Sequence, residues 1–168
     1  MKNAVLLVTA AAILQACAHT ATQQAQSQGR EYTITVKNTL ARERLAPILV
    51  VGDADDRKIW VGAYVSAEAR TQFTTGNPSP LAAQLGGDQI LPGKLGVGEE
   101  LTFKFRTTAR KARITAMVHP DVTPDNYVTA LVDLEAGGTT ALERFDIGDD
   151  EGRKTVVRVG PAGEVRVR

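Results

Sequence analysis

The sequence predicts an all-β protein, an antiparallel β-sandwich of about eight strands with one short helix. Short segments in which apolar and polar residues alternate recur along the chain, separated by turns rich in Gly and Pro. This period of two places successive side chains on opposite faces of a strand. Only 5% of the residues are aromatic, so the core must rest on Val, Leu, Ile and Ala.

The first strand is expected over residues 31–38, where three apolar residues alternate with charged or hydroxyl residues. This pattern is typical of a half-buried strand. Residues 45–51, with the sequence LAPILVV, predict a more continuous apolar strand. Residues 59–65 predict a further strand or a sheet edge.

The one predicted helix follows the loop at residues 76–80, GNPSP. Ser79 is expected to cap it, with Pro80 at its first position. The helix would run through LAAQL and stop at Gly86-Gly87. Later segments with alternating or β-branched residues predict the remaining strands, over 101–106, 114–118, 128–134, 139–145, 155–159 and 164–167. The segment GPAG at 160–163 predicts the turn of a terminal hairpin.

Residues 1–16 predict a lipoprotein signal peptide, and Cys17 is the expected lipidation site. Lys2 precedes an apolar run over residues 4–14, which is too short to cross a bilayer. Cys17 is the only cysteine, so it cannot form an internal disulfide. Cleavage at the A-x-A-like Ala16-Cys17-Ala18 to release a soluble exported protein is the alternative.

Residues 17–30 predict a flexible tether, because they are polar, rich in Gln, Thr and Ser, and without apolar periodicity. The β-sandwich domain is then expected over residues 31–168. Ala18, rather than Asp, follows the cysteine, which in a Gram-negative cell favours the outer membrane. The expected location is thus the cell envelope, with the membrane as a partner through lipidated Cys17.

The charge balance argues against a nucleic-acid partner. Lys2 is the only charged residue in the first 16, so the mature chain carries 19 basic and 19 acidic residues. Arg106, Arg110, Lys111 and Arg113 form a local basic cluster, which is either a solvated turn or a surface for acidic groups.

Catalytic signals are scarce, so the chain is not expected to be an enzyme. The sequence has no G-x-S-x-G segment, and the predicted domain contains one histidine, His119. A triad or a zinc site needs more partners than this. A hydrolase of envelope glycans or lipids and a purely structural envelope protein remain the alternatives.

Two acidic loops are the candidate metal ligands. The first is HPDVTPDNY, which contains Asp121 and Asp125, and the second is FDIGDDEG over residues 145–152. Calcium takes six to eight oxygen ligands, which loops of this kind supply if they converge. Ordinary solvated turns are the alternative, as they are for GDADDR at 52–57.

Several segments, taken in order, resemble the spondin N-terminal domain as it occurs in bacterial proteins. They are EYTITVKN, LAPILVV, GNPSPLAAQL, LPGKLGVGEELTFKF, ARITAMVHPDVTPDNYV and ALERFDIGDDEG. Together they span residues 31 to 165. The resemblance implies a calcium-bearing β-sandwich with a binding or adhesion role and a protein, glycan or lipid partner.

The resemblance also implies the ligands of one structural Ca²⁺. Carried over by motif, these are Asp125, Asp146 and Asp150. The chain departs from the family at Asp149, where relatives usually have Thr, and at Ile147, which replaces a small residue. Asp149 is therefore a competing ligand, and the stretch ADDRKIWVGAYVSAE matches the family poorly.

Overall fold

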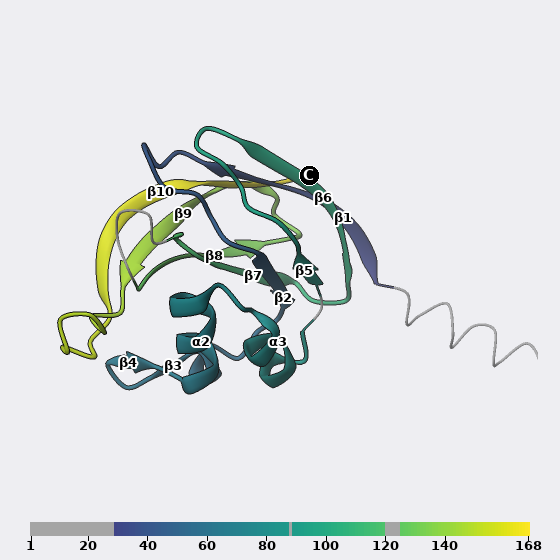
Figure 1. The fold of residues 1–168 in the computed structure, drawn as a ribbon. Coiled ribbons are helices and arrows are strands. Elements are labelled where there is room, and N and C mark those ends of the chain that lie inside the picture. The colour runs from purple at the N-terminus through teal and green to yellow at the C-terminus, as the bar shows by residue number, and fades with distance from the viewer. Residues whose placement is uncertain (1–28, 88, 120–124) are drawn as a thin grey trace, which may run out of the picture.

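The computed structural model of the chain describes residues 29–87, 89–119 and 125–168 (Figure 1). The predicted signal peptide, Cys17 and nearly all of the predicted tether lie outside these residues, as does Asp121. Within them, the predicted all-β class is confirmed: eight antiparallel strands form one large sheet that is nearly closed.

The eight strands pair in the order β5-β2-β7-β8-β9-β10-β1-β6. Their bounds are β1 Arg30–Asn38, β2 Ile48–Gly52, β5 Gln89–Leu91, β6 Glu100–Thr107, β7 Lys111–Met117, β8 Asn126–Asp133, β9 Gly138–Asp146 and β10 Val157–Val167. A separate hairpin consists of β3 (Trp60–Val61) and β4 (Tyr64–Val65).

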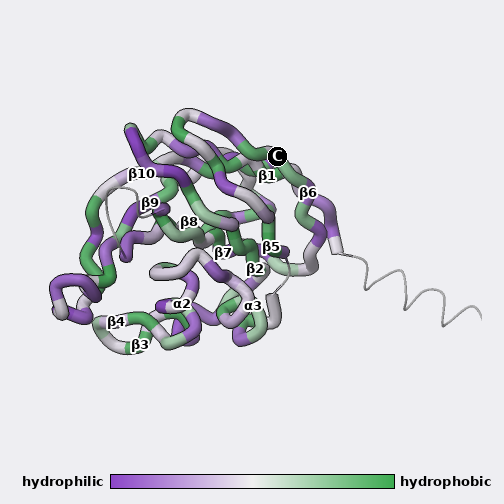
Figure 2. The backbone as a smooth tube through the Cα atoms, viewed as in Figure 1, coloured by the Kyte–Doolittle hydropathy of each residue, from purple (hydrophilic) through white to green (hydrophobic). Residues whose placement is uncertain are grey.

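The sheet folds over itself to form two layers, because β8 and β9 pair through residues 126–129 and 143–146 and diverge beyond them. The strands before this corner and those after it enclose one core, to which Ile34, Val50 and Ile114 contribute. The curvature is plain in Figure 1, and Figure 2 shows apolar segments along β2, β5 and β7. The predicted sandwich-like arrangement follows from this single folded sheet.

A second, smaller core lies between the outer face of the sheet and a layer made of two helices and the β3–β4 hairpin (Figure 1). The helices are α2 (Ala67–Thr75) and α3 (Ser79–Leu85), preceded by the 3₁₀ turn η1 (Asp56–Lys58). Phe73 of α2 stacks on Tyr127 of β8, with ring centroids 3.8 Å apart. Within the described residues, neither helix has the length or hydropathy that a membrane crossing requires.

The helix α3 corresponds to the predicted one and ends at Gly86, which has the left-handed φ of 76°. Its cap differs from the expectation: Ser79 is the first helical residue, and the Asn77 side chain accepts the Ser79 N–H at 3.1 Å. The helix α2 was not predicted. Its sequence AEARTQFTT contains three Thr residues, which are poor helix formers, and only one large apolar side chain.

The predicted terminal hairpin at GPAG is wrong, because residues 157–167 form one long strand, β10. Its register against β9 shifts between Arg158 and Gly160 and again between Pro161 and Gly163, so the Gly and Pro residues form bulges. A Cβ at Gly163 would overlap the Lys37 carbonyl of β1. Glycine is needed there for close approach of two backbones, which composition alone does not distinguish from a turn.

Candidate metal centre

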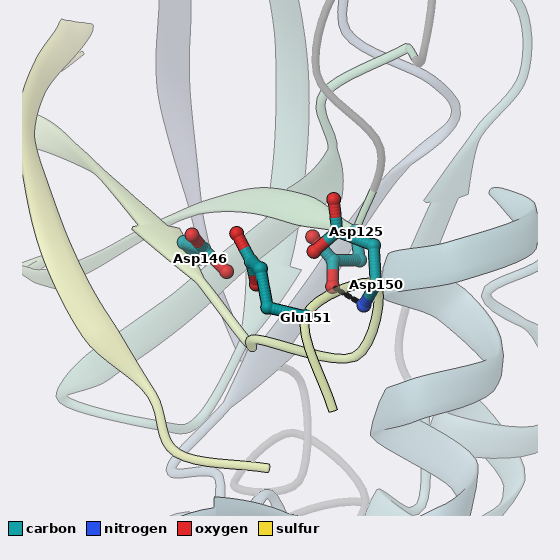
Figure 3. Close-up of side chains that lie close together, drawn as sticks. All are labelled: Asp125, Asp146, Asp150 and Glu151. Atoms are coloured by element: carbon teal, nitrogen blue, oxygen red, sulfur yellow. Dashed lines mark hydrogen bonds between the residues drawn. The ribbon is translucent and has the colours of Figure 1, made fainter. Parts of the chain in front are cut away.

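Four carboxylates meet at one end of the sandwich: Asp125, Asp146, Asp150 and Glu151 (Figure 3). One oxygen from each lies within 4.8 Å of the others. Strand pairing explains the convergence, because Asn126 at the start of β8 faces Asp146 at the end of β9. The structure thus brings the three sequence-predicted ligands together and adds Glu151, the next acidic residue in the same loop. We call these four residues the acidic cluster.

Asp125 is the buried member of the acidic cluster, with 7% of its surface exposed. Its Oδ2 accepts the backbone N–H groups of Asp149 (2.5 Å) and Asp150 (3.0 Å). Its Oδ1 is buried and accepts no hydrogen bond from the residues that the structure describes. Figure 3 shows the carboxyl group of Asp125 beside that of Asp150. Burial raises the pKa of Asp125, and the nearby charges of Asp150 and Asp146 raise it further, against the two backbone hydrogen bonds.

The backbone of Asp125 is in the left-handed region, with φ 52°. Asp and Asn tolerate this conformation better than most residues. The Asp125 carbonyl also accepts the N–H of Ile147 at 3.3 Å. Side chain and backbone of one residue therefore hold the loop after β9 against the start of β8.

Asp146 and Glu151 both pair with the guanidinium of Arg153. Asp146 Oδ1 accepts the Gly148 N–H at 2.6 Å, and its Oδ2 accepts Arg153 Nη2 at 2.9 Å. The same Nη2 lies 3.0 Å from Glu151 Oε2. A hydrogen bond with the Asp150 carboxyl is the main cause that raises the pKa of Glu151. Two carboxyl groups in such contact require a proton or a cation between them.

Asp149, which the sequence indicated as a competing ligand, instead directs its carboxylate to the helical layer. Its carboxylate accepts hydrogen bonds from the Tyr64 hydroxyl of β4 and the Arg70 guanidinium of α2. Burial alone would raise the pKa of Asp149, but these two partners lower it below its usual range. Asp149 therefore ties the loop to the helical layer while its neighbours face the acidic cluster.

The other sequence candidates have ordinary structural partners. In the GDADDR turn, Asp55 caps η1 and Asp56 pairs with Arg113 at 2.5 Å, so these carboxylates do not form a second cluster. The basic cluster separates into ion pairs, since Arg106 contacts Glu31 and Arg110 contacts Glu135. The Nε2 of His119 lies 2.9 Å from Lys94 Nζ.

Comparison of the chain with known protein-family profiles and with curated proteins gives no match. The resemblance to the spondin domain therefore rests on the sequence motifs, and the chemistry of the site must be argued from its own geometry.

The donor set of the acidic cluster suits a hard divalent cation. All four side chains offer oxygen, and they come from two loops that the strand register holds together. Within the described part of the chain, one buried oxygen of the cluster has no hydrogen-bond partner. An unpaired buried carboxylate oxygen is costly, and a cation supplies the missing charge. Calcium accepts such flexible loop geometry more readily than magnesium does. A metal ion therefore fits the residues present.

Proposed function

We propose that this protein is a non-enzymatic binding or adhesion module of the cell envelope, with one structural Ca²⁺ at the acidic cluster. The observation that carries the calcium site is Asp125 Oδ1, a buried oxygen that has no hydrogen-bond partner among the described residues, in a carboxyl group that lies beside three further carboxylates. The envelope location rests on the predicted lipidation of Cys17, and the binding role on the resemblance to spondin domains.

The cation would act on the fold by joining two segments that carry like charge. Asp125 directly precedes β8, and the other three carboxylates belong to the end of β9 and the loop after it. Without a cation, their mutual repulsion favours separation of the segments. With one, this end of the sandwich becomes rigid and presents its loops to a protein, glycan or lipid partner.

The hydrolase alternative requires a titratable group in a cleft. A cavity of about 180 Å³ lies between β5 and β6, and Glu99 and Glu100 are among its lining residues. Both carboxylates have partners: Glu99 accepts the Gly96 N–H at 2.7 Å, and Glu100 pairs with Lys37 at 3.3 Å. These contacts are those of a turn and a strand pair, which favours the binding-module proposal.

The test of the proposal is the double substitution Asp146→Asn with Asp150→Asn. In calcium, the double variant should melt at a lower temperature than the wild type, and its melting temperature should no longer depend on calcium. Glu99→Gln with Glu100→Gln is the matched control, because it also removes two negative charges but leaves the acidic cluster intact. An equal calcium response in the wild type and the Asp146/Asp150 variant would refute the site.

A further inference from the structure

Arg153 occupies the same carboxylates that the proposed cation would bind. Its Nη2 bridges Asp146 Oδ2 and Glu151 Oε2, at 2.9 and 3.0 Å. Among the described residues, these are the ion pairs that the acidic cluster makes. One guanidinium therefore offsets part of the charge of four carboxylates, and the buried Oδ1 of Asp125 has no partner in residues 29–87, 89–119 and 125–168.

The loop is built so that Arg153 can fold back over it. Gly148, with φ 73°, lies beneath the arginine, and a Cβ at this position would come within 3.0 Å of the Arg153 Cβ and 3.3 Å of the guanidinium carbon. The Arg153 N–H also donates to the Gly148 carbonyl at 2.7 Å. The backbone of Arg153 is thus fixed at the edge of the acidic cluster.

The side chain of Arg153, by contrast, can move away from the acidic cluster into solvent. It is 41% exposed, whereas the side chain of Arg113, which pairs with the one carboxylate of Asp56, is 10% exposed. An arginine at the surface can turn its guanidinium into water without opening the core. Displacement of the Arg153 side chain therefore breaks two partly exposed ion pairs and leaves the packing of the core unchanged.

We propose that Arg153 is an internal counter-ion that competes with the cation and sets the affinity of the acidic cluster. This inference rests on the proposed calcium site. In the metal-free protein, Arg153 limits the repulsion between Asp146 and Glu151. When Ca²⁺ binds, the guanidinium is displaced, so part of the binding free energy is spent on breaking these ion pairs. Arg153 affects the affinity for Ca²⁺ by competition and is not itself a ligand.

The experiment is a calorimetric Ca²⁺ titration of the full chain, together with thermal melting in EDTA. Arg153→Gln should bind Ca²⁺ about tenfold more tightly than the wild type, which corresponds to loss of a pair of partly exposed ion contacts. In EDTA the same variant should melt at a lower temperature. Arg153→Lys keeps the charge without the bridging geometry and should give an intermediate affinity. Arg110→Gln, which removes an equal charge beside Glu135, is the control and should leave the affinity unchanged.

The outcomes separate this inference from the function on which it rests. If Arg153→Gln binds Ca²⁺ with the wild-type affinity or more weakly, Arg153 does not compete, and the inference is wrong while the calcium site stands. If the wild type and Arg153→Gln both release no heat with Ca²⁺, the proposed site itself is wrong, and the inference fails with it. A tenfold gain shared by Arg110→Gln would reduce the effect to overall charge and overturn the role of Arg153.

Discussion

At the scale of single residues, Asp125 combines burial, a left-handed backbone and an oxygen that none of the described residues contacts by a hydrogen bond. These three features oppose the folding of a metal-free chain. They are also what a pre-organised ligand requires, because the carboxylate is already held by the N–H groups of Asp149 and Asp150. A cation that completes the site would offset the free energy that these features cost on folding.

Two substitutions of Asp125 separate charge from geometry. Asp125→Asn keeps an acceptor for the two N–H groups and a residue that tolerates positive φ, so in EDTA it should be as stable as the wild type or about 1 kcal/mol more stable. It should gain nothing from calcium. Asp125→Ala loses the acceptor and the tolerance and should lose about 2–3 kcal/mol. Urea unfolding with and without calcium measures both, and a calcium response retained by Asp125→Asn would contradict the account.

Tyr127 gives a prediction about pH. Burial raises its pKa to about 12, despite the hydrogen bond that its hydroxyl accepts from Trp60 Nε1 at 2.8 Å. The unfolded chain ionises near pH 10, so stability is intact below that pH and falls as the pH rises from about 10 towards 12, by up to roughly 3 kcal/mol.

The measurement for Tyr127 is urea unfolding of the wild type and Tyr127→Phe between pH 8 and 11. Other tyrosines and lysines titrate in both proteins, so only the difference reports Tyr127. The wild type should lose stability faster than Tyr127→Phe above pH 10. Parallel pH profiles would show that Tyr127 is not the group responsible.

At the scale of elements, α2 connects the helical layer to the acidic loop. Gln72 is fully buried, and its side chain exchanges hydrogen bonds with the hydroxyl (2.9 Å) and carbonyl (3.2 Å) of Thr115 on β7. Phe73 stacks on Tyr127, and Arg70 holds Asp149. One short helix thus fixes both the sheet face and the loop that carries three of the four carboxylates.

Truncation of Phe73 tests this connection. Phe73→Ala removes a fully buried ring and should cost about 3–5 kcal/mol in the free energy of unfolding. Because α2 also anchors Asp149, calcium affinity should fall as well. Thr71→Ala, at a half-buried position of the same helix where the hydroxyl donates to the Ala67 carbonyl, is the control and should change stability by less than about 1 kcal/mol. Equal effects of the two variants would mean that α2 is not docked as described.

Sequence patterns predicted those elements in which the alternation of apolar and polar residues matches burial on one face. The first strand and the strand at 101–106 show alternation because each has one face towards the core, and both were found with small changes at their ends. The helix α2 and the short edge strand β5 were missed, since neither has a periodic apolar face of useful length. Their positions depend on the sheet that they contact.

The candidate site also contains residues that the sequence indicated and residues that it did not. The resemblance to the spondin motifs indicated Asp125, Asp146 and Asp150, and strand pairing brings them together. Glu151 was one of the acidic residues in the same loop and was not singled out. The roles of Asp149 and Arg153 depend on contacts with distant or folded-back groups, and these contacts leave no signal in the local sequence.

At the scale of the whole molecule, one sheet folded at the β8–β9 corner creates both the core and the site. The paired part of these strands ends at Asn126 and Asp146, directly beside the acidic cluster. Ligation of the acidic cluster would therefore stabilise the corner that joins the two layers. Calcium should act on the unfolding of the entire domain and not on one loop.

The calcium dependence of the melting temperature of the full chain tests the central claim most directly, with a calorimetric titration on the same sample. We predict saturable binding at one site. At a calcium concentration about 100 times the dissociation constant, linkage gives about 2.7 kcal/mol of added stability, or a rise of roughly 5–10 °C for a domain of this size. No heat of binding and an unchanged melting temperature would contradict the account, and the acidic loops would then be solvated turns.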